Sequence, residues 1–543
     1  MKHTIKLLLG ALLILGMAAA CDTDELHDMN INPNAVQEID MNYFFTACCL
    51  GTASNGTSGD NRYTDWRTNV GTCAHAIQQL ATTATGGIGG DGDKYMDGYV
   101  EGFNAPFQFM YRDVGKRATE VIKQTSEGGI FEGRMVNTKQ ASRILLAFNY
   151  LRITDWYGNV PFTEANKGLE GTFQPKYDKQ KDIYTACLKE LDEACAGFDA
   201  ADVDYSLFKK ADIIYGGDIA KWKKFGYSLM LRYAMRVSNV DAAMAANYVT
   251  KAVAGGTMTS NADIPWIQMT ISPSEWTNQN GISRGFYPGD GGQWSASFLS
   301  KTLMDILKGT NPASTADDDP RLTVFTAGPI QWTASDLGTV LEPDPTKWIG
   351  LPNGKDQSQV NNELFGGTAV INYEKFCAVN TKMLQDDEPY QIAGAAESEL
   401  LKAEAIVRGI GTVPGTAQQH YEAGVRLAMQ VYDKYDATLA VSDAKVDAYL
   451  ALYPYDATKA LEQIGTQLWL SKWFNWWDSW CDVRRSGYPV LTPTNYIGNA
   501  TGGKMIRKLL IPAAEASGNP NYAEGATLPD KLDTKVWWDG GAN

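Results

Sequence analysis

The segment at residues 141–165, ASRILLAFNYLRITDWYGNVPFTEA, constrains the fold most strongly. Read at the helical period, it carries two apolar stripes, one of Ile144, Leu145, Phe148, Leu151 and Trp156 and one of Leu146, Tyr150, Ile153 and Tyr157. A helix that is apolar over more than half of its circumference needs neighbours on both sides, as in a stack of helical pairs. Gly158 and Asn159 favour a helix end, and Pro161 prevents the helix from resuming. The segment therefore predicts an interior helix that ends in a sharp turn.

Further motifs follow in a fixed order. Tyr-Gly-Asn-Val-Pro at residues 157–161 precedes Gln-Pro-Lys-Tyr-Asp at 174–178 and a helical pattern at 181–196. Asp-Asp-Pro-Arg lies at 318–321, an alanine- and glutamate-rich helix at 395–408, a Trp-x3-Arg-Arg-x-Gly-Tyr-Pro element at 480–489, and RKLLIPAAEASGN at 507–519. This series resembles the SusD-like (SusD/RagB) family of nutrient-binding outer-membrane lipoproteins from about residue 40 to about residue 520.

The resemblance implies a mainly α fold, in which a curved scaffold of tetratricopeptide-like helix pairs carries a loop-rich inserted lobe. It implies ligand contacts from the loops before the third scaffold helix and from the inserted lobe, which correspond to residues 63–103 and 264–294. These positions vary in the family, so the resemblance assigns no individual residue. The partner that it implies is a SusC-like TonB-dependent transporter, for which the protein would act as a lid.

Helical patterns divide the rest of the chain. They occur at about 41–52, 68–84, 105–126, 138–157, 181–196, 218–237 and 240–254, and again at 395–409, 415–435 and 459–485. Between them, residues 255–388 are rich in Gly, Pro, Asp, Ser and Thr, and only 297–308 has a clear helical pattern. We therefore expect an N-terminal helical scaffold at 41–254, a loop-rich binding lobe at 255–388, and C-terminal helices at 389–543 that complete the scaffold.

The N-terminus has the pattern of a lipoprotein signal peptide at residues 1–20. Lys2 and Lys6 precede an apolar run that is too short to span a bilayer, and Ala18-Ala19-Ala20 leads to Cys21. An ordinary secretory signal, with Cys21 incidental, is the alternative. If Cys21 is acylated, residues 21–40 form a tether, and the acidic residues after Cys21 resemble an export signal to the outer face of the outer membrane.

The net charge and the cysteine content exclude further partners and structural features. The net charge of −15 disfavours nucleic acid as a partner, because a polyanion repels an acidic protein. After Cys21, an odd number of cysteines remains, which excludes a complete disulfide framework. Cys187 and Cys195, on one predicted helix, are too far apart to bridge, and we expect small buried thiols.

Motifs for catalysis, cofactors or metal ions are missing from the sequence. It has no His-Glu-x-x-His, Gly-x-Ser-x-Gly or phosphate-binding Gly-rich motif. A glycosidase needs two facing carboxylates, which a chain with 63 acidic residues could supply, so a secreted hydrolase stays an alternative. Residues 86–97 offer Asp91, Asp93 and Asp97 to a hard cation, but they lack the last ligand of an EF-hand, and we expect a mobile acidic loop.

Aromatic side chains on loops are the best candidates for ligand contacts, because they pack on the C–H faces of sugars while amides bind the hydroxyls. The candidate set consists of Trp66, Tyr95, Tyr99, Trp276, Asn278, Tyr287 and Trp294. Each aromatic could instead pack inside the lobe. By contrast, Trp469, Trp473, Trp476 and Trp480 recur on one helical face, which predicts scaffold packing, and Arg484 and Arg485 at that helix end are expected to be structural.

These observations favour a surface lipoprotein that binds an oligosaccharide and is not an enzyme. A relative of the same architecture that binds peptides is the second hypothesis, since some proteins of this kind serve peptide import.

Overall fold

The computed structural model describes residues 39–54, 64–272, 278–286, 297–333, 336–367, 373–527 and 529–543. The predicted signal peptide, Cys21 and most of the predicted tether lie outside these ranges. Within the described ranges, none of the helices combines the length and the apolar character needed to cross a bilayer.

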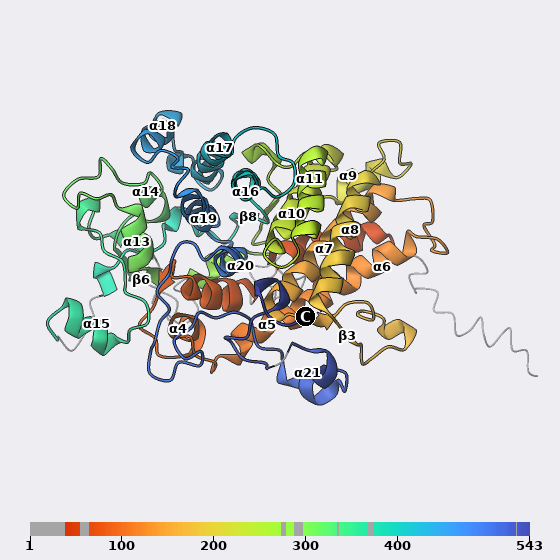
Figure 1. Ribbon diagram of the computed structural model, residues 1–543, viewed down its shortest axis with the longest axis horizontal. Coiled ribbons are helices and arrows are strands. Elements are labelled where there is room, and N and C mark those ends of the chain that lie inside the picture. Colours follow the sequence, from red (N-terminus) through yellow and green to blue (C-terminus); the bar gives the residue numbers. More distant parts are fainter. Residues whose placement is uncertain are drawn as a thin grey trace, which may run out of the picture.

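Helix α7 (Val136–Tyr157) lies among α3, α6, α8 and α10, in the middle of the helical part of the molecule (Figure 1). All residues of its first predicted stripe are buried, and in the second stripe only Leu146 is partly exposed. The expectation of an interior helix with neighbours on both sides is therefore confirmed.

The turn after α7 requires glycine. Gly158 has φ +82° and ψ −128°, a conformation open almost only to glycine, and its N–H donates to the Thr154 carbonyl oxygen at 2.8 Å. The C-terminal part of the chain closes over this turn, since Asn159 N donates to Thr527 Oγ1 at 2.8 Å. A Cβ at residue 158 would lie 2.0 Å from Thr527 Oγ1.

Five pairs of packed helices form the scaffold in the described part of the chain. The pairs are α3 (Met41–Ser54) with α6 (Lys116–Gln124), α7 with α8 (Gln180–Ala196), α10 (Ile219–Arg236) with α11 (Ala242–Gly255), α16 (Ala395–Arg408) with α17 (Ala417–Met429), and α19 (Ala460–Ser471) with α20 (Trp476–Ser486). Figure 1 shows α6 to α11 on the right and α16 to α19 at the top. This mainly α arrangement agrees with the expected scaffold of helix pairs.

Two predicted helices have a different form. The helix expected at 68–84 is the π-helix η1 (Asp65–Ala74), which ends before strand β1 (Leu80–Ala81). The helix expected at 105–126 consists of α5 (Val100–Met110), a π-helical turn η2 (Tyr111–Gly115) and α6. Hydrophobic periodicity does not distinguish these wider turns from α-helix, so the sequence could not show them.

The single helix predicted at 459–485 is wrong, because the chain breaks between α19 and α20. Phe474 has φ +72°, and Asn69 of η1 binds both sides of the break, donating to the Phe474 carbonyl oxygen at 2.7 Å and accepting from Trp477 N at 3.1 Å. Contacts from a distant segment thus determine the break. The four tryptophans are nevertheless buried, as expected for scaffold packing.

The described strands form short antiparallel pairs, and the first two pairs join residues 255–388, which we call the inserted segment, to segments outside it. Strand β1 pairs with β5 (Phe298–Leu299), and β4 (Trp266–Gln268) pairs with β8 (Pro389–Gln391). The other pairs are β2 (Val160–Pro161) with β3 (Tyr177–Asp178) and β6 (Ile330–Thr333) with β7 (Asp336–Val340). The helix expected at 297–308 begins later, as α13 (Lys301–Leu307), because β5 takes its first residues.

Shorter helices complete the described part of the chain. They are α4 (Gly87–Lys94), α9 (Tyr205–Ala211), α12 (Gly281–Phe286), α14 (Leu322–Phe325), α15 (Gln357–Leu364), α18 (Asp443–Leu452), α21 (Ala513–Gly518) and α22 (Tyr522–Gly525). The seven cysteines after Cys21 are free and buried, as expected.

A cluster of buried charges joins α10, α16 and α20. Arg232 donates to Glu397 at 2.8 Å and to Asp478 at 2.9 Å, and Lys472, in the break before α20, donates to Glu397 at 2.7 Å. Two further pairs belong to this buried charge cluster, Arg236 with Asp482 at 3.3 Å and Arg485 with Glu404 at 2.7 Å. Burial opposes the ionisation of Asp482, but Lys472 and Arg236 outweigh burial and lower its pKa to about 2. The expectation that Arg485 is structural is confirmed by its pairing, and Arg484 is buried over the Trp480 ring.

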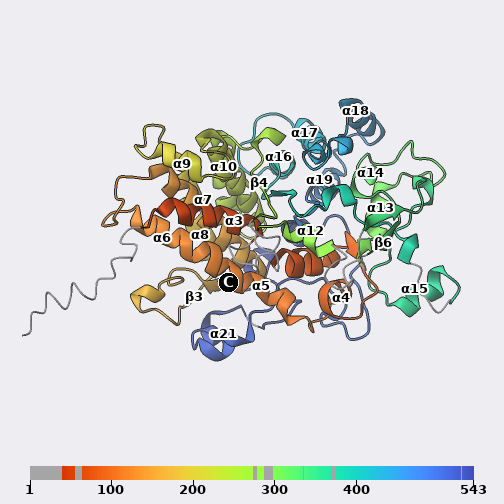
Figure 2. The ribbon, with the colours of Figure 1, turned by 180° about the vertical axis from the view of Figure 1, so that it is seen from behind.

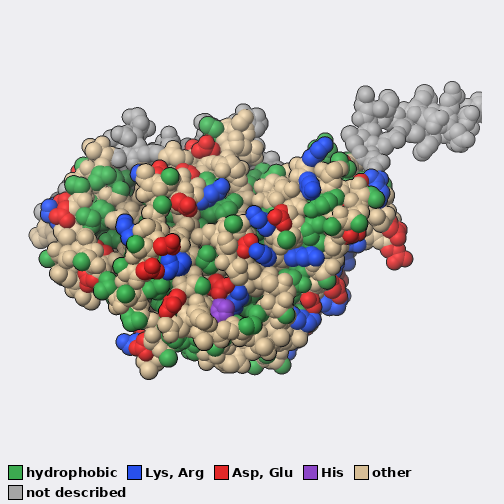
Figure 3. All heavy atoms as spheres, turned by 90° about the horizontal axis from the view of Figure 1, so that it is seen from above, with side chains coloured by type: hydrophobic (Ala, Val, Ile, Leu, Met, Phe, Trp, Pro, Cys, Tyr) green, Lys and Arg blue, Asp and Glu red, His purple; other side chains and the backbone are tan. Residues whose placement is uncertain are grey.

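His420 connects α17 to α16 and to the loop before α17. Its Nδ1 lies 2.6 Å from Glu399 Oε2, and its Nε2 lies 2.8 Å from the Pro414 carbonyl oxygen. Both ring nitrogens face acceptors, so the doubly protonated ring satisfies both. The hydrogen bond to Glu399 raises the pKa of His420, and Lys402, which also donates to Glu399, opposes this. Figure 3, the view from above, shows one histidine side chain at the surface with acidic and basic side chains near it.

Replacement of Gly158 tests the turn. We expect Gly158→Ala to lower the free energy of unfolding by about 3 kcal/mol or more, because it adds the clash with Thr527 to backbone strain. Gly171→Ala is the matched control, since Gly171 has φ +87° with open space around it, and it should cost about 1 kcal/mol. Equal losses in chemical denaturation would contradict the close approach of Thr527.

His420 predicts a pH dependence. Since its pKa is higher in the folded chain than the unfolded value of about 6.5, its stabilising contribution is complete below that pH and is lost as pH rises through the folded pKa. We expect the free energy of unfolding of the wild-type chain, relative to that of His420→Gln, to fall by about 1 kcal/mol or less between pH 6 and pH 9. Chemical denaturation of both chains at several pH values measures this difference. A difference between the two chains that does not change with pH would argue against the charged pair.

Candidate functional site

The first turn of η1 is the platform of the candidate site. Asp65 Oδ1 accepts from the Tyr390 hydroxyl of β8 at 2.8 Å, and Thr68 Oγ1 donates to the Gly102 carbonyl oxygen of α5 at 2.7 Å. Together with the bonds of Asn69 to the break before α20, these contacts fix the turn from three sides. Burial raises the pKa of Asp65 to about 7, although Tyr390 and Arg152 oppose the shift. The platform is therefore held by contacts to β8, to α5 and to the break before α20.

Trp66 lies on this turn and Tyr99 lies at the start of α5, and both residues are partly exposed. Arg67 links them, because it follows Trp66 in the chain, hydrogen-bonds the Tyr99 side chain, and pairs with Glu101 at 3.2 Å. Burial raises the pKa of the Tyr99 hydroxyl, which stays protonated and can donate a hydrogen bond. A Cβ at Gly102 would lie 2.6 Å from the Tyr99 ring, so this glycine lets the ring lie against the backbone of α5.

Helix α12 borders the same platform, and Asn278 precedes this helix in the chain. Thr270 N donates to the Asn278 carbonyl oxygen at 2.9 Å, and Asn280 fastens the next residues to 386–388, donating to the Asp386 and Glu388 carbonyl oxygens at 2.7 and 3.2 Å. Helix α12 then packs on η1, where a Cβ at Gly285 would be 3.5 Å from the Trp66 ring. Figure 2 shows α12 and β4 near the middle of the face seen from behind. Asn278 is partly exposed, as a ligand contact requires.

We name this surface the front face and define it by Trp66, Arg67, Tyr99, Glu101 and Asn278. It combines two aromatic rings with an amide, a carboxylate and a guanidinium. Apolar ring faces beside planar polar groups are the arrangement that suits a hydroxyl-rich ligand.

One predicted site residue does not reach this face. Tyr95 is completely buried, and its hydroxyl donates to the Ala76 carbonyl oxygen at 3.0 Å. It packs in the core as the residue that ends α4, with φ +57°. Trp276, Tyr287 and Trp294 lie outside the described residues, so they stay predictions.

The expectation of a mobile acidic loop at residues 86–97 is wrong for most of this segment. Residues Gly87–Lys94 form α4, in which Asp91 and Asp93 are buried. Asp93 pairs with Lys94 at 2.7 Å and accepts from Gly354 N at 2.8 Å. These partners satisfy the carboxylate, whereas Asp97 is exposed. In the described parts of the chain, no group of three or more His, Cys, Asp or Glu side chains is arranged to hold a metal ion.

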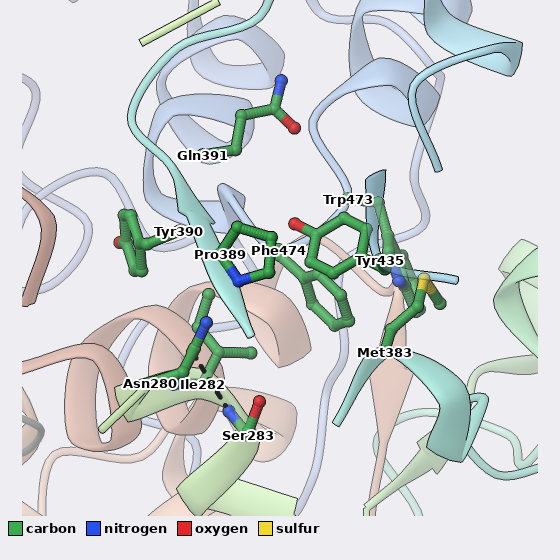
Figure 4. Close-up of a pocket in the computed structure, with 10 residues that line it drawn as sticks. All are labelled: Asn280, Ile282, Ser283, Met383, Pro389, Tyr390, Gln391, Tyr435, Trp473 and Phe474. Atoms are coloured by element: carbon green, nitrogen blue, oxygen red, sulfur yellow. Dashed lines mark hydrogen bonds between the residues drawn. The ribbon is translucent and has the colours of Figure 1, made fainter. Parts of the chain in front are cut away.

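A small cavity lies between α12, β8 and the break before α20 (Figure 4). Its lining includes Asn280, Ser283, Tyr390, Gln391, Tyr435 and Phe474, and its volume of about 10 Å³ is enough for one water molecule. The Tyr435 and Phe474 rings pack edge to face with centroids 5.9 Å apart. Gln391 and Tyr435 are partly exposed here, and the sequence carried no signal for them, because they come from segments far from the predicted loops. The cavity is too small for a sugar ring.

Comparisons with known proteins agree with this fold. The sequence model of a SusD-like family described as "starch-binding associating with outer membrane" matches residues 33–512. A solved structure of a chitin-binding protein is 27% identical, with a TM-score of 0.75 over 93% of this chain and 100% of that chain. A chitin-binding SusD homologue from Flavobacterium johnsoniae is 23% identical, with a TM-score of 0.70 over 92% of this chain and 99% of that one, and shows the fold alone. No curated protein matches the sequence.

The family match spans the helix pairs, the inserted segment and the front face. The chain therefore belongs to the SusD-like family of carbohydrate-binding proteins that associate with the outer membrane.

Proposed function

We propose that the protein is a lipid-anchored receptor at the cell surface, which binds an oligosaccharide on the front face and delivers it to a SusC-like TonB-dependent transporter. The observation that carries the proposal is that Arg67 links two partly exposed aromatic residues, because it follows Trp66 in the chain and hydrogen-bonds Tyr99, while it also pairs with Glu101. The 27% identical chitin-binding protein supports a glycan as cargo.

The chemistry of the front face favours a neutral glycan. Arg67 and Glu101 form a 3.2 Å pair, so their charges offset one another and leave hydrogen-bonding groups rather than a net charge. The rings supply apolar contact for C–H groups, which contributes about 0.5–1.5 kcal/mol for each well-packed ring. Trp276, Tyr287 and Trp294 of the predicted set would add further rings to the same face.

The anchor and the partner rest on the sequence and the family. Acylation of Cys21 would attach the chain to the outer membrane, with residues 22–40 as the tether. The transporter would receive the glycan while the protein itself performs no chemistry, in keeping with a family of binding proteins.

Aromatic substitutions test the front face. We expect Trp66→Ala to weaken oligosaccharide binding about tenfold in calorimetry, because it removes a ring from the platform. Trp276→Ala and Trp294→Ala should also weaken binding and leave the melting temperature nearly unchanged. Phe173→Ala is the control, since Phe173 is 81% exposed and lies on another loop, and its affinity should equal that of the wild type. A large loss of stability in the Trp276 or Trp294 variant would place that residue in the core.

Ligand screening distinguishes the two kinds of cargo. A glycan array and a peptide pool should be applied to the chain without its signal peptide. We expect saturable binding to a glycan that Trp66→Ala weakens. Saturable peptide binding without glycan binding would reject the oligosaccharide and support a peptide receptor of the same architecture.

A further inference from the structure

A second surface feature, a groove that borders α13, shares no residue with the front face. It lies between α13, the loop at 309–320 and the helices α18 and α19, and its volume is about 370 Å³. That volume falls within the range of small-molecule sites in proteins, which begins at about 300 Å³. Its rim includes Asp305, Thr310, Asp317, Lys459, Glu462 and Gln463.

The floor of the groove is an ordered polar cluster. Gln467 is 3% exposed, its Nε2 donates to the Tyr449 hydroxyl at 3.0 Å, and its Oε1 accepts from Arg321 at 2.9 Å. Arg321 is itself paired with buried Asp319 at 2.6 Å, so the amide of Gln467 has a fixed orientation. Because the Tyr449 hydroxyl accepts from Gln467, its own proton remains to be donated.

One wall of the groove is aromatic. The Tyr449 and Tyr453 rings lie with centroids 5.1 Å apart, and Tyr421 lines the groove near them. The Tyr453 hydroxyl donates to the Asp317 carbonyl oxygen at 2.8 Å, and Asp317 Oδ2 accepts from Thr310 N at 2.7 Å. These bonds fix the loop at 309–320 against α18. The groove is thus formed in advance of any ligand.

The lining defines the chemistry of a ligand. Acidic side chains outnumber Lys308 and Lys459 in the lining, which disfavours an anion, whereas the polar rim disfavours a wholly apolar molecule. The acidic side chains are Asp305, Asp317, Asp319 and Glu462. Tyrosine rings beside a fixed amide and carboxylates suit a ring with apolar C–H faces and several hydroxyl groups. We propose that the groove is a second binding site and that its ligand is a short neutral saccharide. The proposal does not depend on the front face.

The test uses three neutral disaccharides, cellobiose, maltose and N,N′-diacetylchitobiose, with saturation-transfer NMR to detect binding and calorimetry to measure affinity. The chain carrying Trp66→Ala should still bind at least one of them. Adding Tyr453→Ala to that chain should weaken this binding about tenfold, because it removes a ring of the wall. Glu462→Ala, at an exposed position of α19, should also weaken disaccharide binding. If Tyr453→Ala lowers the melting temperature, the affinity of the Glu462→Ala chain is the deciding measurement.

The matched control is Lys189→Ala with Glu193→Ala, which removes an exposed pair on α8 and should leave the affinity unchanged. The proposal is overturned if none of the three disaccharides binds the Trp66→Ala chain. It is also overturned if the Glu462→Ala and Tyr453→Ala chains bind the disaccharide with the same affinity as the control. Binding of a peptide pool that these two variants abolish, without disaccharide binding, would overturn the saccharide as the ligand class. A failure of Trp66→Ala to change oligosaccharide binding would count against the front face and leave the groove standing.

Discussion

The buried charge cluster is the constraint on which the rest of the structure depends. Arg232 joins α10 to α16 through Glu397 and to α20 through Asp478, with both partners buried. Removing one partner of such a pair leaves an uncompensated buried charge, at a cost of about 3–5 kcal/mol. The alanine- and glutamate-rich helix and the Trp-x3-Arg-Arg element supply several of these charges, among them Glu397, Glu404 and Arg485. The motifs that mark the family are thus the parts that orient its helices.

The front face follows from this orientation. The position of α20 places Trp477 N and the break at Phe474 where Asn69 can bind both, and Asn69 belongs to the same turn as Trp66. Strand β8 adds the Tyr390 bond to Asp65, and α12 covers the other side. The aromatic rings therefore stand on elements fixed by long-range contacts. A preformed face reduces the side-chain entropy that binding would otherwise cost.

The sequence predicted features that depend on local periodicity. The two stripes of α7, the turn at Gly158 and the burial of Trp469 and Trp480 all appear as expected, because one helix face repeats at a fixed spacing. Trp66, Tyr99 and Asn278 were predicted from residue type and loop context; they are partly exposed, and their contact with a ligand stays a prediction.

The remaining features depend on contacts between distant segments. Tyr95 has the composition and context of a loop aromatic, and only its bond to Ala76 shows that it is buried. Asp93 of the acidic run is buried in α4, where Lys94 and Gly354 bind its carboxylate, and Gly354 comes from a distant segment. The groove could not be predicted either, since Asp305, Asp317 and Tyr449 come from separate segments that meet only in the fold.

A crystal structure of the chain with a bound oligosaccharide tests the central claim most directly. The account predicts a sugar ring against Trp66 and Tyr99, with α7, α10, α16, α20 and η1 in the positions that they have without ligand. A glycan bound away from both rings, or a binding face that forms only through a shift of these helices, would contradict it.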